Sequence, residues 1–267
     1  MVKPRITRVL VAVGLLLLGA GGSSRAGESL SADAIIAKAV ARGQKARSKE
    51  TLPGYTYTKV SVTEEFDASG NIKERKEKVF EVLFDSGRTR LKLVEVNGHA
   101  PGEAELKKQA ENEKHVQRMV GQSKSQSDSR DNPLTPEMVA RFDFELLGEK
   151  EINGRRAYKI SFRPKNADAP VHHIVDRLLN RISGTVCIDA EEFEIAQAEV
   201  FLGSEVNLLG GVVGSLKKLA YTITRTRVGD GIWFNTFSSG DFEGRKLLDS
   251  TRIKTKSQSI NFRPVTS

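Results

Sequence analysis

The chain has 267 residues, a formal net charge of +8, one cysteine and an apolar fraction of 38%. This length allows one large or two small domains. A single cysteine excludes an internal disulfide framework, so stability has to come from buried apolar surface. Basic and acidic residues are interleaved along the chain, which is not the pattern of a nucleic-acid-binding protein.

The first residues have the pattern of a secretory signal peptide. Basic residues near the start precede an apolar run from Val9 to Leu18, and small residues around Ala26 supply a cleavage site. The apolar run is shorter than the roughly 18 residues that a membrane-spanning helix needs. We therefore predict cleavage near Ala26 and export to the periplasm. The mature chain, residues 27–267, then has a formal charge of +4.

The beginning of the mature chain predicts one helix and a three-stranded meander. Ser31 is a suitable helix N-cap and apolar residues follow at helical spacing, so a helix is expected over residues 32–46. Acidic and basic residues alternate from Lys73 to Lys78, and we interpret this run as a solvated strand face. Turn residues separate three extended runs, which we expect to form strands at 55–66, 72–85 and 88–96.

The middle of the chain is polar. A charged helix with few apolar residues is expected on the surface over residues 103–120. The polar stretch around residues 121–134 is typical of a mobile loop, although it could also mark a domain boundary. Because the strand pattern resumes afterwards without a new start signal, we favour a single domain over residues 27–267.

The second half predicts more strands than helices. Short helices are expected at 135–141 and 171–181, and the hairpin Ile182–Leu202 has an acidic, solvent-facing tip at Asp189, Glu191 and Glu192. Turns are expected at Asp230-Gly231 and Glu243-Gly244. Helices do not alternate with strands one by one, which favours an α+β fold with an antiparallel sheet. The remaining strands are expected at 142–150, 156–163, 218–228, 232–242 and 246–262.

No pattern for catalysis or metal binding is found. The sequence contains no phosphate-binding loop, dinucleotide fingerprint, serine elbow or zinc-protease motif. His172 and Asp176 are one helical turn apart, but two ligands do not make a metal site, so a polar helix edge is the simpler interpretation. Cys187 has no predictable base beside it and is expected to be a buried structural thiol. We predict no enzyme activity, no metal and no cofactor.

The apolar faces of the strands are more informative. A sheet that few helices cover could curve around an apolar hollow and hold a ligand, although the same residues could simply fill a core. The glycine-rich run 208–216 could be a flexible apolar lip or a bulged strand. The first helix and the segment around Ile174 and Leu178 are lid candidates, with Ile35 and Ile36 facing inward. The predicted lining consists of Val186, Ile188, Val200, Leu202, Tyr221, Ile223, Trp233 and Phe237.

Several stretches together resemble the LolA-like family of periplasmic lipoprotein-sorting carriers. They are the signal peptide, the helix leading into GYTYTKVSV, the NGHAPGEAEL turn, the SGTVCIDAEEFEIAQAEV hairpin and the VGDGIWFNT strand. The resemblance implies an open half-barrel whose curved antiparallel sheet has helices covering its concave side. It also implies a monomeric carrier that binds acyl chains of a lipoprotein or another lipid. Cargo would pass between membrane-associated donor and acceptor proteins without chemistry.

The chain departs from that family in two respects. It is longer than a minimal carrier, and no residue is identified as the arginine that latches the lid in such carriers. The same fold also serves as a periplasmic sensor or protein-interaction module. That module is the alternative function.

Overall fold

The computed structural model describes residues 30–48, 54–85, 88–121, 134–171, 174–208, 214–246 and 249–265. The predicted signal peptide and most of the predicted polar loop and glycine-rich lip lie outside these residues. The chain divides into two compact units, Met1–Leu30 and Ser31–Ser267, and the elements below belong to the second. In the described part of the chain, no helix combines the length and apolar character needed to cross a membrane.

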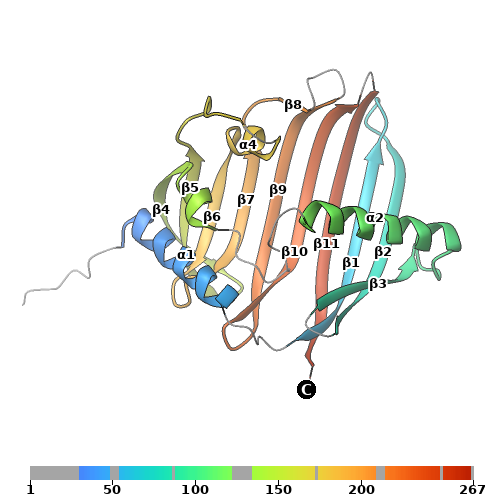
Figure 1. Cartoon of the computed structure of the whole chain (residues 1–267), viewed down its shortest axis with the longest axis horizontal. Helices are drawn as coiled ribbons and strands as arrows, with labels where there is room; N and C mark the ends of the chain where they lie inside the picture. Colours follow the sequence, from blue (N-terminus) through green and yellow to red (C-terminus); the bar gives the residue numbers. More distant parts are fainter. Residues whose placement is uncertain are drawn as a thin grey trace, which may run out of the picture. The chain divides into compact units, whose positions relative to one another are not determined.

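One antiparallel sheet of 11 strands forms this unit (Figure 1). The strands follow the order β3-β2-β1-β11-β10-β9-β7-β6-β5-β4, and the short β8 pairs with β9. The strands β3 and β4 end this order, so the sheet is open and the predicted α+β class is confirmed. The bounds are β1 Tyr55–Phe66, β2 Ile72–Asp85, β3 Arg88–Val96, β4 Phe142–Ile152, β5 Arg155–Pro164, β6 Ile182–Asp189, β7 Ile195–Leu202, β8 Val206–Leu208, β9 Gly214–Gly229, β10 Ile232–Lys246 and β11 Asp249–Pro264.

The longer helices lie on one face of the sheet, which we call the helix side; the opposite face is the outer face (Figure 1). Helix α1 contacts β4 and β6 and buries Ile35 and Ile36. Helix α2 lies near β2: its residues Glu105 and Lys108 are close enough to Lys78 of β2 to shift the pKa of that lysine. The helices of the described part of the chain are α1 Ala32–Ser48, α2 Glu103–Gly121, α3 Pro136–Val139 and α4 Ile174–Leu179.

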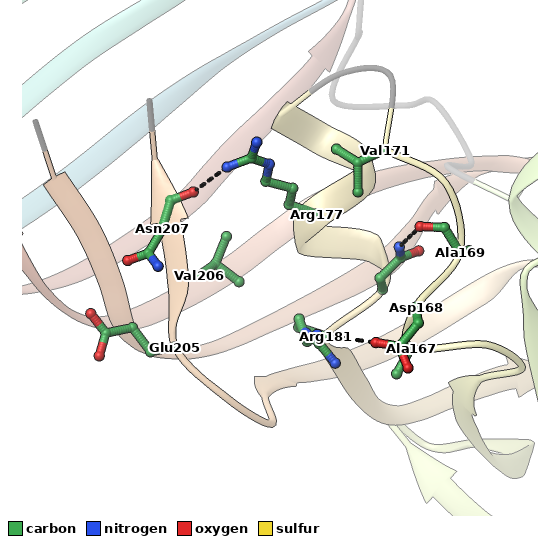
Figure 2. A pocket seen from close by; sticks show the side chains of 10 residues that line it. Ala167, Asp168, Ala169, Val171, Arg177, Arg181, Glu205, Val206 and Asn207 are labelled. Carbon is green, nitrogen blue, oxygen red and sulfur yellow. Dashed lines mark hydrogen bonds and ion pairs between the residues drawn. The ribbon is translucent and has the colours of Figure 1, made fainter. Parts of the chain in front are cut away.

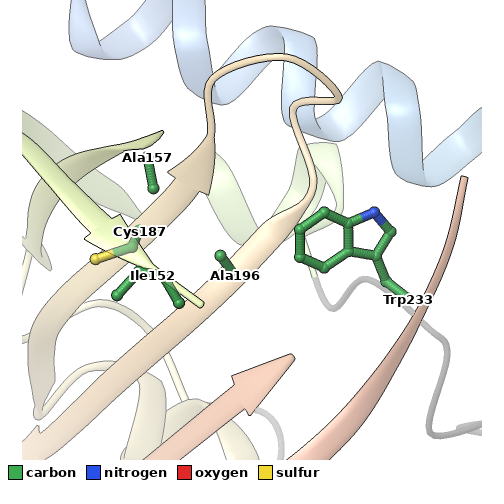
Figure 3. Close-up of a cluster of buried hydrophobic side chains, with 5 residues drawn as sticks. All are labelled: Ile152, Ala157, Cys187, Ala196 and Trp233. Atoms are coloured by element: carbon green, nitrogen blue, oxygen red, sulfur yellow. The ribbon is translucent and has the colours of Figure 1, made fainter. Parts of the chain in front are cut away.

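The pairing register assigns side chains to the two faces. Directly paired residues share a face and neighbours along a strand alternate. Val186, Ala198 and Ile223 pair in turn across β6, β7 and β9, and therefore share the helix side. Cys187 consequently belongs to the outer face. It is buried, as predicted, in a cluster with Ile152, Ala157, Ala196 and Trp233 (Figure 3).

Two expectations about turns are wrong. Glu243 and Gly244 lie inside β10, where they pair with β11 and β9. A Cβ on Gly244 would lie 2.6 Å from the carbonyl oxygen of Ser215, so this glycine permits close strand approach instead of a turn. Asp189, expected at a solvent-facing tip, is only 1% exposed. Its carboxylate accepts hydrogen bonds from Arg155, which explains the burial.

Candidate functional site

Six of the eight predicted lining residues share the helix side. Val200 pairs with Tyr221, Val186 is connected to Ile223 through Ala198, and the remaining two are Ile188 and Leu202. Val186 and Ile188 are buried, whereas the other four are only half-buried. Neighbouring apolar side chains that stay partly exposed mark a candidate binding surface. We use the name floor for five half-buried apolar residues on the helix side of β7, β9 and β10: Val200, Leu202, Tyr221, Ile223 and Phe242.

The other two predicted lining residues are placed elsewhere. Phe237 pairs with Thr224, which alternates with Ile223 and thus belongs to the outer face. Trp233 packs in the cluster of Cys187, and its indole N–H donates to Glu192 at 2.7 Å. Strand β10 has register shifts on both sides of Trp233. Such shifts change the alternation, which the sequence pattern alone does not reveal.

The lid candidates differ in their surroundings. Ile35 and Ile36 of α1 are buried completely, on the side of α1 that contacts the sheet. Leu178 of α4 is half-buried. The side chain of Ile174 lies outside the described residues.

Helix α1 is fixed to the sheet by an arginine. The Arg42 guanidinium donates to the carbonyl oxygen of Gly231 at 2.6 Å and lies 4.0 Å from the carboxylate of Glu194. Glu194 in turn forms an ion pair with Arg225, whose side chain is 2% exposed. Sequence reasoning missed this contact, because the two partners of Arg42 come from distant segments and no local pattern connects them.

A second group of charges closes the β6–β7 hairpin. Arg155 binds Asp189 through two hydrogen bonds of 2.7 and 2.9 Å, and Arg227 binds Glu192 at 2.6 Å. Burial alone would raise the pKa of Asp189, but the bonds from Arg155 and from two backbone N–H groups outweigh it and lower the pKa. These carboxylates are held by fixed partners, which indicates a structural role.

The floor continues into a strip of small residues. The ring of Phe242 lies over Gly240, where an added Cβ would come within 2.3 Å of it, and is tilted against Tyr221 at 6.4 Å between centroids. From Ile223 the register runs through hydroxyl side chains of β10, β11 and β1 to Lys78 of β2. The row consists of Ile223, Ser238, Ser257, Ser61 and Lys78.

The far end of this strip carries two lysines. Lys59 and Lys78 lie on the helix side of β1 and β2 and are half-buried. Burial lowers the pKa of Lys59. Burial also lowers the pKa of Lys78, with further lowering by Lys76 and Lys108. Within the described residues, neither ammonium group has an ion pair or a hydrogen bond.

Two pockets lie away from the floor. One, of about 370 Å³, lies between the segment 167–171, α4 and β8 (Figure 2). Its polar groups bind each other: Arg177 donates to the Asn207 carbonyl oxygen, and Arg181 lies 3.6 Å from Asp168. The other, of about 520 Å³, is on the outer face and is lined by residues such as Lys254 and Lys256. In the described part of the chain, no group of three His, Cys, Asp or Glu residues could hold a metal.

Comparisons with known proteins find similar structures only. Neither a family model nor a curated protein matches the chain. A DUF1329 family protein from Desulfovibrio piger is 13% identical, with 88% of this chain and 93% of that chain covered and a TM-score of 0.33. The lipoprotein LppX from Mycobacterium tuberculosis is 10% identical, with 88% and 99% covered and a TM-score of 0.32. A LolA superfamily protein from Nitrosomonas europaea is 10% identical, with 90% and 96% covered and a TM-score of 0.30.

The structural neighbours thus include the family that the sequence resembles. At TM-scores this low, only the chain's own residues can support a function.

Proposed function

We propose that this is an exported, non-enzymatic protein that binds the acyl chain of a lipoprotein or another lipid on the floor. The observation that supports the proposal is the row of apolar side chains on inner strands that remain half-buried. Apolar surface in the middle of a sheet is normally covered, and contact with an acyl chain would stabilise it by about 0.8 kcal/mol per buried methylene. Periplasmic location and membrane-associated donor and acceptor proteins are part of this proposal.

Binding and release would use α1 as the lid. Its inner face is apolar, while Arg42 connects it to Gly231 and Glu194. Opening would break these polar contacts and expose Ile35 and Ile36, so the closed form is favoured without a ligand. Transfer needs no bond to be made or broken.

Native mass spectrometry of the exported protein tests the proposal. We expect the purified protein to carry a lipid adduct, or to take up added lipid after delipidation. Ile223→Asp places a charge on the floor and should lower lipid uptake at least tenfold, since an acyl chain cannot solvate a carboxylate. Thr222→Asp is the matched control, because Thr222 is the next residue on β9 and belongs to the outer face.

Equal uptake by the two variants would show that lipid binds elsewhere. A clean mass for the unmodified protein, with no uptake of fatty acid or lipoprotein, would instead favour the periplasmic protein-interaction module.

A further inference from the structure

The lysines at the end of the strip differ from three other lysines of the same sheet. Lys76 lies 3.1 Å from Glu74, Lys92 lies 3.1 Å from Glu81, and Lys218 lies 2.8 Å from Asp241. Among the residues that the structure describes, no carboxylate forms such a pair with Lys59 or Lys78, although both lysines are half-buried and the pKa of each is lowered. An ammonium group removed from water without a partner is unfavourable.

The two cations also face the same space. Lys59 pairs with Phe80 and Ser61 pairs with Lys78, so the two lysines are diagonal neighbours across β1 and β2. Such neighbours lie roughly 7–8 Å apart. Helix α2 adds Lys108 and Glu105 to this region, but Glu105 is the weakest influence on Lys78 and accepts a hydrogen bond from the Gly102 N–H. The region therefore has excess positive charge.

We propose that the natural ligand is an anionic amphiphile, whose carboxylate or phosphate group binds between Lys59 and Lys78 while its chain lies on the floor. This inference rests on the proposed function, because the floor has to hold the chain. The row from Ile223 to Lys78 crosses four strand spacings, or roughly 19 Å. Apolar contacts are at one end of that row and cations at the other.

The hydroxyl groups between them suit an anionic head group. The Ser257 hydroxyl donates to the Ser61 oxygen at 3.0 Å, which leaves the Ser61 hydroxyl hydrogen available to an acceptor. Two ammonium groups and a hydroxyl supply several donors, some of them charged, to one anion. A cationic amphiphile would be repelled there, and an uncharged one would leave both lysines without a partner.

Competition binding to the delipidated full-length mature protein tests this assignment. The ligands are dodecanoate, dodecyl phosphate, dodecanol and dodecyltrimethylammonium, which displace the neutral probe N-phenylnaphthylamine. We expect dodecanoate or dodecyl phosphate to compete at concentrations at least about tenfold below those of dodecanol. The better of the two anions distinguishes a fatty-acid carboxylate from a phosphate head group.

In the double variant Lys59→Met, Lys78→Met, the affinity for anions relative to dodecanol should fall at least about tenfold. The affinity for dodecanol itself should not change. The matched control is Lys256→Met, on the outer face of β11. Thermal unfolding of each variant verifies that it is folded.

The outcomes separate the two proposals. If anions and dodecanol bind equally well, or if the double variant keeps the preference, the head-group site is overturned while lipid binding on the floor stands. If no amphiphile displaces the probe and none is taken up, the proposed function fails and this assignment fails with it.

Discussion

The two ends of the helix side differ in whether their buried charged side chains are paired. Under α1, Arg225 and Glu194 are almost completely buried and compensate each other, with Arg42 as a third member. On β1 and β2, near α2, Lys59 and Lys78 are half-buried, and within the described ranges neither forms an ion pair. The difference indicates that the α1 end is electrostatically complete as the chain folds, whereas the α2 end is complete only with a bound anion.

Apolar packing follows the same division. Ile36 of α1 and Ile188 of β6 are buried to 1% and 0% exposure. Tyr221 and Ile223 of β9, on the same face of the sheet, are half-buried. A filled core and an unfilled floor therefore share one sheet, and each should respond differently to substitution.

The largest effect is expected from removing the charge of Glu194. Glu194→Gln leaves the Arg225 cation buried without its counter-charge, which should lower the free energy of unfolding by roughly 3–5 kcal/mol. Glu191→Gln is the control, because that side chain is 77% exposed beside Arg155 and should change stability by less than about 1 kcal/mol. Urea denaturation measures both. Similar small losses in the two variants would show that the α1 end does not depend on this ion pair.

Truncation of apolar side chains should separate the filled core from the floor. Ile36→Ala opens a cavity under α1 and should cost roughly 2–5 kcal/mol. Ile223→Ala removes methyl groups that water already reaches in part, so about 1 kcal/mol or less is expected. The denaturation midpoints of the two variants give the comparison. Equal costs would mean that the floor is packed as tightly as the core.

The sequence predicted the local part of this arrangement well. Alternation along β6 placed Val186 and Ile188 on one face and Cys187 on the other, as the register shows. It failed for Phe237, because a bulge in β10 between Asn235 and Phe237 changes the alternation without a sequence signal. Regular alternation also made the run around Lys78 look fully solvated, yet helix α2, which follows β3 in the chain, lies near it.

Long-range ion pairs were beyond prediction for a related reason. In the sequence, the strands β1 to β6 lie between Arg42 and Glu194. Each of the two looks like an ordinary surface charge in its own segment. Only the folded register brings them together. The sequence pattern therefore predicted the strands and much of the floor, but not the charges that distinguish the α1 end of the helix side from the α2 end.

Acid should lower the stability of the fold through carboxylates of the outer face, by a smaller amount than the substitutions above. The pKa of Asp241 is lowered to about 2, chiefly by hydrogen bonds from Arg252, and that of Asp189 is also lowered. A lowered folded-state pKa means that the ionised form stabilises the fold. That contribution is complete above the ordinary pKa of 3.8 and is lost as pH falls toward 2. Asp241→Asn should flatten the loss of stability over this range, measured by denaturation at several pH values. An unchanged pH profile would contradict the role of Asp241.

The smallest effect, and the one that bears most directly on the α2 end, is expected for Lys78→Met. Burial and nearby lysines lower the pKa of Lys78, so its charged form destabilises the fold at neutral pH and this penalty disappears only as pH rises toward 10.5. Removing the charge should leave stability unchanged or raise it by up to about 1 kcal/mol. Lys76→Met, which breaks the pair with Glu74, should lower stability by up to about 1 kcal/mol.

Thermal melts with dodecanoate extend the test of Lys78. A bound anion stabilises the native state, so dodecanoate should raise the melting temperature of the wild type more than that of Lys78→Met. An equal rise would mean that the anion does not use this cation.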